Sequence, residues 1–174
     1  MKDALALHRW LLAHQVHHEI VRLPRPMTRA GELPETIPAA PGRCVMVTVL
    51  YVATGIGHEV VIAVASPVAA PPRPEAVAGL LGVRQARAVP AHVVNSVTDY
   101  ADGLVCPLLL PKSLPMFIDD RLLADTKTVF TATGERHTAL SIRALDLLAL
   151  MPGKMVDLRG ARPRGSREAV AQQH

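Results

Sequence analysis

The stretch that decides the fold is CVMVTVLYVATGIGHEVVIAVAS, residues 44–66. Two runs rich in β-branched residues, 44–53 and 58–66, flank the short sequence TGIG at 54–57. Such runs around a glycine-bearing turn predict a β-hairpin. Both runs are apolar on both faces of the expected strand, which is typical of strands covered on both sides. We therefore expect this hairpin at the centre of a sheet.

Further elements are expected on both sides of the hairpin. Residues 4–14 carry leucines at helical spacing, and residues 17–23 alternate like a strand, with Ile20 and Val21 on opposite faces. We also expect helices near 29–33 and over 74–81, 91–98, 121–124 and 142–150, and strands over 83–90, 114–120, 127–133, 138–142 and 154–158. Helices and strands interleave irregularly, so the predicted fold class is α+β with a mixed sheet.

Local end signals set some of these boundaries. Pro74 stands at the first turn of its helix, and Gly82 is a C-cap that ends it. Asp119 closes a strand and is expected to cap the short helix after it. Ser141 is expected to cap the helix over 142–150.

The totals favour one soluble domain. A chain of 174 residues with 49% hydrophobic and 20% charged residues has the composition of a single globular domain. Its two cysteines, Cys44 and Cys106, suit a reducing cytosol better than a disulfide framework. Asp3 interrupts the apolar start, which argues against a signal peptide, and the apolar runs 45–53 and 60–65 are far shorter than the roughly 20 residues of a membrane helix. We expect a cytoplasmic protein.

The net charge of +4 is compatible with a polyanionic partner such as RNA. Part of the excess lies in the last residues, at Arg159, Arg162, Arg164 and Arg167. We interpret 1–158 as one domain and 159–174 as a basic, flexible tail. Two hypotheses for this tail remain open: a solvated chain end, or an arm that contacts RNA phosphates.

A stiff apolar loop follows the helix over 91–98. It reads TDYADGLVCPLLLP, residues 98–111, and contains the pattern Gly-x-x-x-Pro from Gly103 to Pro107. Glycine lets a backbone approach a ligand closely, and proline fixes the shape of a loop in advance. The residues alone fit either a tight structural turn or a loop that faces a ligand.

The order of elements and several local strings resemble the YbaK/prolyl-tRNA synthetase-associated domain family of aminoacyl-tRNA editing domains. The loop is similar to the family's Thr-Gly-Tyr-x-x-Gly-Gly-x-x-Pro loop, and its matching residues are Thr98, Tyr100, Gly103 and Pro107. Asp99 and Leu104 replace the other two glycines of that loop. The strings at 114–124, 131–150 and 153–158 resemble later parts of the family, so the resemblance runs from the first helix to Leu158.

This resemblance implies a twisted, barrel-like mixed sheet with flanking helices. It implies hydrolysis of misacylated tRNA, mainly the tRNA for proline, without a metal or organic cofactor. It also implies a pocket between the sheet and the loop, where backbone groups hold the aminoacyl ester and the terminal ribose. The implied catalytic residues are Gly103 and His137, and the implied substrate-binding residues are Tyr100, Leu104, Val105, Cys106, Pro107, Val47 and Met46.

One family residue is missing. The family carries a lysine in the strand that here reads CVMVTVLYV, and Val47 or, one residue earlier, Met46 occupies its position. Valine and methionine carry no charge, so a developing oxyanion finds no cation there. Either catalysis uses other groups, such as the loop amides and His137, or the pocket only binds its ligand. Lys112, just past the loop, is a candidate replacement.

Three other residue groups have competing interpretations. His137 either lies in the pocket or is a surface histidine in a turn. Cys106 is expected to pack in the core, because its neighbours provide no base that would turn its thiol into a nucleophile. His14, His17 and His18 have the spacing of a zinc site, but the first helix should end near His14, and we therefore expect no metal there.

Three functions therefore follow from the sequence. The first is a freestanding deacylase of misacylated tRNA. The second is a catalytically silent member of the same family that binds aminoacyl-tRNA or an amino-acid-like ligand. The third is an interaction module that docks on an aminoacyl-tRNA synthetase.

Overall fold

The structure is a computed structural model that describes residues 1–38, 41–124 and 127–159. Within these ranges, eight strands form one sheet. They are β1 His18–Arg22, β2 Cys44–Gly55, β3 His58–Pro67, β4 Gln85–Ala88, β5 Met116–Asp119, β6 Thr128–Ala132, β7 Thr138–Arg143 and β8 Lys154–Val156. Their order is β1-β7-β6-β2-β3-β5-β8, with β4 paired to β2.

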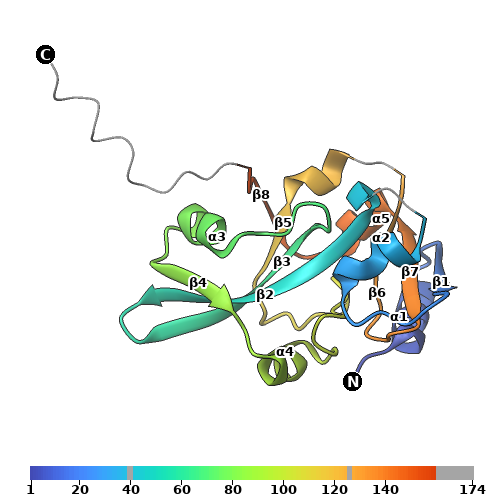
Figure 1. Cartoon of the computed structure of the whole chain (residues 1–174), viewed down its shortest axis with the longest axis horizontal. Coiled ribbons are helices and arrows are strands. Elements are labelled where there is room, and N and C mark those ends of the chain that lie inside the picture. The colour runs from blue at the N-terminus through green and yellow to red at the C-terminus, as the bar shows by residue number, and fades with distance from the viewer. Residues whose placement is uncertain (39–40, 125–126, 160–174) are drawn as a thin grey trace, which may run out of the picture.

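The predicted hairpin is confirmed as the centre of this sheet. Strands β2 and β3 pair antiparallel from Val45 opposite Pro67 to Ala53 opposite Glu59. Strand β2 also pairs with β6 and β4, and β3 pairs with β5. Figure 1 shows the outer part of the hairpin extending away from the other strands, with β4 beside it. Burial follows this arrangement: residues 62–67 of β3 are buried, whereas residues 58–60 at its outer end are exposed.

The sheet is mixed, as the sequence predicted. Pairs β2–β6, β3–β5 and β5–β8 are parallel, whereas β1–β7, β6–β7, β2–β3 and β2–β4 are antiparallel. The sheet curves without closing into a barrel, since β1 and β8 form the two ends of the strand order. The α+β class and the single domain are therefore confirmed, and the sheet is open.

Helices connect and flank the strands. They are α1 Ala4–Ala13, α2 Leu33–Thr36, α3 Pro74–Leu81, α4 Ala91–Thr98 and α5 Ala144–Leu150, with 3-10 turns at η1 Ala30–Glu32, η2 Pro41–Arg43 and η3 Asp120–Ala124. Helix α3 begins at Pro74 and ends before Gly82, whose φ of 65° is the left-handed C-cap that the sequence predicted.

The predicted cap at Ser141 is wrong. Ser141 lies inside β7, where it pairs with Phe130 of β6 and Glu19 of β1. Strand β7 continues to Arg143, which stands at the N-cap of α5 without a side-chain cap bond. Because β7 has a neighbour on each side, pairing with both strands outweighs the local capping preference of serine.

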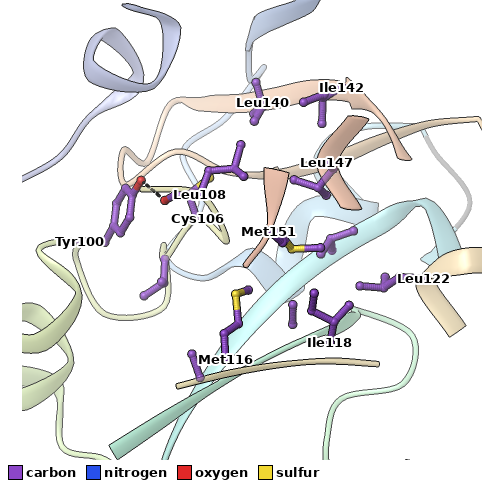
Figure 2. Close-up of a cluster of buried hydrophobic side chains, with 14 of the residues drawn as sticks. Tyr100, Cys106, Leu108, Met116, Ile118, Leu122, Leu140, Ile142, Leu147 and Met151 are labelled. Atoms are coloured by element: carbon purple, nitrogen blue, oxygen red, sulfur yellow. Dashed lines mark hydrogen bonds between the residues drawn. The ribbon is translucent and has the colours of Figure 1, made fainter. Parts of the chain in front are cut away.

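The main hydrophobic core joins the sheet to α1, α5 and the loop at 98–111. Buried side chains from all four regions belong to it, and Figure 2 shows those of the sheet, α5 and the loop. A second cluster includes Leu23, Met27, Leu33, Cys44 and Leu104. The loop contributes to both clusters, so it is part of the folded core.

No helix of the described residues is long and apolar enough to span a membrane. Residues 160–174, with Arg162, Arg164 and Arg167 of the predicted basic tail, lie outside the described residues.

Candidate functional site

The loop at 98–111 leaves α4 through a tight turn. Asp99, which follows the last residue of α4, has a φ of 59°. The buried hydroxyl of Thr98 donates a hydrogen bond to the carbonyl of Val94 at 2.7 Å and accepts one from the amide of Tyr100 at 3.1 Å. Thr98 therefore fixes the direction in which the chain leaves the helix.

Tyr100 closes the loop from inside. Its side chain is fully buried, and its hydroxyl donates a hydrogen bond to the carbonyl of Leu108 at 2.7 Å, drawn as a dashed line in Figure 2. Burial raises the pKa of Tyr100 well above its ordinary value of 10, so the hydroxyl keeps its proton as a donor. This bond ties the two halves of the loop together.

Gly103 lies against a neighbouring segment. Its φ is +80°, and a Cβ added there would lie 2.9 Å from the carbonyl oxygen of Thr28 and 3.1 Å from Cβ of Arg29. Its carbonyl accepts a hydrogen bond from the amide of Ala30 at 2.8 Å. Both the left-handed conformation and the close backbone contact require glycine here.

Lys2, at the start of the chain, also holds the loop in place. Its ammonium donates hydrogen bonds to the carbonyl of Thr98 at 3.1 Å and to the carbonyl of Leu109, and it lies 5.2 Å from the centre of the Tyr100 ring. The amide of Lys2 donates to the carbonyl of Asp99 at 2.8 Å. Partial burial lowers the pKa of Lys2 below its ordinary 10.5. Sequence reasoning missed this residue and considered Lys112, which is exposed.

Several amides of the loop have no protein partner. The amide of Leu104 donates to the carbonyl of Ala101 at 3.0 Å, whereas those of Gly103, Val105 and Cys106 donate to no group among the described residues, as is also true of Ala101, Leu109 and Leu110. Backbone amides without a protein acceptor are available to donate to water or to a ligand. The loop therefore offers a short row of hydrogen-bond donors held in a fixed shape.

The side chains of this loop face the core. Those of Tyr100, Leu104, Val105, Cys106 and Pro107 are all buried. A ligand at this loop would therefore meet backbone atoms rather than these side chains, and the substrate-binding role predicted for the five residues stays a prediction.

Cys106 packs as a small core residue. Its side chain is fully buried, and burial raises the pKa of its thiol from 9.0 to about 12. A thiol with such a pKa stays protonated near neutral pH and is a poor nucleophile. The packing role that the sequence predicted is consistent with this environment.

The position of the missing lysine is apolar. Val47 and Met46 are both half-buried, and Val47 packs against the main core whereas Met46 packs against the cluster that contains Leu104. The adjacent hydroxyl of Thr48 is buried and forms no hydrogen bond among the described residues, as is also true of Thr131. From the sequence, Thr48 served only to align this strand with the family strand that carries the lysine. Nothing in the sequence indicates that its hydroxyl lacks a partner.

His137 lies in the exposed turn between β6 and β7. Its carbonyl accepts a hydrogen bond from the amide of Leu23 at 2.8 Å, and the neighbouring Arg136 carbonyl accepts one from Met27 at 2.9 Å. Leu23 and Met27 belong to the segment that contacts Gly103 at Thr28 and Arg29, so this segment joins the turn to the loop. The side chain of His137 is exposed, and its catalytic role stays a prediction.

Two other predictions concern Asp119 and the histidines near the end of α1. Asp119 is structural, as expected: its fully buried carboxylate accepts a hydrogen bond from the amide of Arg121 at 3.0 Å and pairs with that guanidinium at 2.6 Å. Helix α1 ends before His14, and His18 shares a 2.8 Å hydrogen bond with His8. The described residues contain no group of three side chains placed to hold a metal ion.

Comparison with known proteins bears on this site. Residues 25–150 match the profile of a family described as "Aminoacyl-tRNA editing domain", which covers the loop, the turn at His137 and strand β2. No curated protein matches the chain in sequence.

Solved structures share the fold, among them the three that follow. The hypothetical protein APE2540 has a TM-score of 0.69 at 21% identity, over 87% of this chain and 97% of that one. A scaffold protein for computational epitope backbone grafting has a TM-score of 0.66 at 23% identity, over 87% and 90%. A protein described as "a putative trans-editing enzyme for prolyl tRNA synthetase" has a TM-score of 0.64 at 24% identity, over 81% and 85%.

Proposed function

The chain belongs to the aminoacyl-tRNA editing domain family, and from this premise we propose that it is a trans-acting deacylase that hydrolyses the ester of misacylated tRNA. The tRNA for proline is the substrate to test first, because one structure with the same fold is described in relation to prolyl tRNA synthetase. We place this activity in the cytoplasm.

The observation that carries this proposal is the row of free amides at Gly103, Val105 and Cys106. In ester hydrolysis, the oxygen of a water molecule bonds to the ester carbonyl carbon, and the carbonyl oxygen becomes negative. The bond to the ribose oxygen then breaks, and that oxygen takes a proton. Fixed N–H groups that face the developing charge stabilise it by about 3 kcal/mol each in other enzymes.

The rigidity of the loop supports the same proposal. Tyr100 and Lys2 bind its two halves together, and Gly103 is in contact with Thr28 and Arg29. Donors that are held before the substrate arrives need no rearrangement during the reaction. We assign the orientation of water or of a ribose hydroxyl to His137, whose imidazole can donate or accept near neutral pH.

A catalytically silent, ligand-binding domain is the second candidate. The observation that favours it is the apolar strand at Met46 and Val47, which provides no cation opposite the loop. Such a domain would bind aminoacyl-tRNA or an amino-acid-like ligand through the same amides without lowering the barrier to hydrolysis.

A deacylation assay separates the two candidates. Purified protein is mixed with a panel of tRNAs charged with correct and incorrect amino acids, beginning with tRNA for proline, and release of the amino acid is compared with buffer. The deacylase proposal requires release well above the buffer rate for at least one mischarged tRNA. Binding of tRNA without release from any substrate would contradict it and leave the silent domain.

A synthetase is the remaining candidate partner. Pull-down with nuclease-treated lysate tests whether the chain docks on an aminoacyl-tRNA synthetase in the absence of RNA. A complex that persists without RNA, together with no deacylation, would favour the interaction module.

A further inference from the structure

Four exposed arginines lie on the segment that contacts Gly103 and on the turn that is hydrogen-bonded to this segment. Arg22 ends β1, Arg25 and Arg29 lie in the following loop, and Arg136 lies in the turn between β6 and β7. All four side chains are exposed. We refer to these four residues as the arginine ridge.

Backbone hydrogen bonds hold the segments that carry the ridge side by side. The amide of Leu23, next to Arg22, donates to the carbonyl of His137 at 2.8 Å, and the amide of Met27 donates to that of Arg136 at 2.9 Å. The same segment reaches Gly103 through the amide of Ala30. The ridge therefore begins at β1 and ends at the loop that carries the free amides.

Arg29 is the member of the ridge closest to that loop. Its Cα and Cβ lie 3.4 and 3.1 Å from the position that a Cβ on Gly103 would occupy. The backbone of Arg29 thus lies one residue from the hydrogen bond between Ala30 and Gly103, and its exposed side chain begins there.

The charges of the ridge are largely uncompensated. Arg22 and Arg29 form no ion pair within the described ranges, and Arg25 meets Glu35 only at 3.5 Å between exposed side chains. Exposed pairs of this kind neutralise little charge.

The nearby acids are engaged elsewhere. Glu32 accepts hydrogen bonds from the amide and hydroxyl of Thr28 at 3.0 and 2.6 Å, and Glu135 accepts from the hydroxyl of Thr138 at 3.2 Å. Neither carboxylate forms an ion pair with a guanidinium of the ridge, although the charges of Arg29 and Arg25 contribute, after the hydrogen bonds of Thr28, to the lowered pKa of Glu32. These acids therefore offset only part of the positive charge, and the remainder is suited to a polyanion.

We propose that the arginine ridge binds phosphates at the acceptor end of tRNA. This inference rests on the proposed function, since a substrate ester at the free amides requires the preceding nucleotides to leave past Gly103. Arg29 is the nearest cation of the ridge on that path, and Arg136 and Arg22 continue it. Guanidinium groups bind phosphate through two parallel hydrogen bonds, and a row of them follows a nucleic acid backbone without reading its sequence.

The test measures binding of uncharged tRNA as a function of salt concentration, so it needs no hydrolysis. We expect Arg29→Gln and Arg136→Gln each to weaken binding about fivefold and to lower the slope of log K against log salt by roughly 0.7 to 0.9 per lost contact. Arg84→Gln is the matched control, because Arg84 is exposed between α3 and β4 and removing it changes the net charge equally. Thermal unfolding verifies that the variants are folded.

The outcomes separate this inference from the proposed function. Equal binding and equal slopes for the ridge variants and Arg84→Gln would overturn the ridge, whether or not the protein deacylates tRNA. The absence of measurable tRNA binding by the unaltered protein would overturn it as well. Weakened binding by the ridge variants alone supports the ridge, even if no mischarged tRNA is hydrolysed and the deacylase proposal fails. If the ridge variants lose binding to an acidic protein but bind tRNA as the unaltered protein does, the proposal that the ridge binds tRNA is wrong.

Discussion

The turn at Gly57 and the loop at Gly103 use glycine in nearly the same backbone conformation and in opposite surroundings. Their φ angles are +81° and +80°. A Cβ on Gly57 would meet nothing within 4 Å, whereas one on Gly103 would meet the carbonyl of Thr28 at 2.9 Å. The neighbour of Gly57, Ile56, is 96% exposed, and Tyr100 near Gly103 is fully buried.

This contrast separates two demands on a turn. The hairpin turn has only to reverse the chain between β2 and β3, so conformation is its one requirement. The loop at 98–111 must also keep its amides in place, and contacts with Lys2 and Thr28 together with its internal hydrogen bond from Tyr100 to Leu108 hold it. Equivalent substitutions should therefore cost more stability in the loop than in the hairpin turn, and they should differ most in their effect on activity.

The largest difference is expected from Gly103→Ala against Gly57→Ala. Each substitution places a side chain at positive φ, which costs about 1 kcal/mol in free energy of unfolding. Only Gly103→Ala must also move the backbone of the loop or of Thr28, and displacement of about 1 Å in an active site costs about a hundredfold in rate. Deacylation rates and urea unfolding curves of both variants measure the two effects. An active Gly103→Ala would show that the loop is misassigned.

The two tyrosines give the next comparison. Tyr100→Phe leaves the carbonyl of Leu108 without its donor, which should lower the free energy of unfolding by about 1–3 kcal/mol and slow deacylation about tenfold. Tyr51 lies on the hairpin with its ring 4.5 Å from the guanidinium of Arg87, and its hydroxyl has no hydrogen bond within the described ranges. Tyr51→Phe should therefore stay within about 0.5 kcal/mol of the unaltered protein. Equal effects of the two changes would contradict the closing role of Tyr100.

A smaller effect is expected at Lys2. Lys2→Met keeps a long apolar side chain but removes the donor to the carbonyls of Thr98 and Leu109, and we expect about 1 kcal/mol lower stability and roughly fivefold slower deacylation. Lys112→Met is the control, because Lys112 is exposed just beyond the loop. If Lys112→Met reduces the rate more than Lys2→Met, the cation that matters is Lys112, which was proposed because it follows the loop in the sequence.

The smallest effect is expected at the cysteines. Burial raises the pKa of Cys44 and Cys106 to about 11 and about 12, so the folded thiols keep their protons at pH 8 and should resist alkylation until urea exposes them. Because the folded state then binds more protons than the unfolded state above pH 9, these thiols lower stability only as the pH rises beyond 9. Cys106→Ala should deacylate within about twofold of the unaltered protein. Rapid alkylation of Cys106 that abolishes activity would restore the nucleophile hypothesis.

The sequence predicted those parts of the molecule whose signals are local. The hairpin at 44–66, the start of α3 at Pro74 and its end at Gly82 follow from β-branched runs, proline and glycine, and the structure has each of them. The loop was recognisable because Gly103 and Pro107 are four positions apart. Ser141 failed as a cap because β7 pairs with strands on both sides, which a local pattern does not reveal.

The rest of the site depends on contacts between distant segments. Nothing in the spacing of the chain links Lys2 to Leu109, or Thr28 to Gly103, because folding of the whole sheet brings them together. The free amides at Val105 and Cys106 are equally invisible in the sequence, since every residue but proline has an amide and only the fold decides which are used.

The hydrogen bonds of Lys2 have a consequence for the order of folding. They join residues that are 96 and 107 positions apart, and contacts of such separation close a large stretch of chain. Contacts of this kind slow folding relative to local ones such as the β2–β3 hairpin. During refolding, the circular dichroism signal of the strands should therefore recover before the hydrogen-bonded loop amides of Tyr100 and Leu104 become protected from hydrogen exchange, and the ability to act on tRNA should return last.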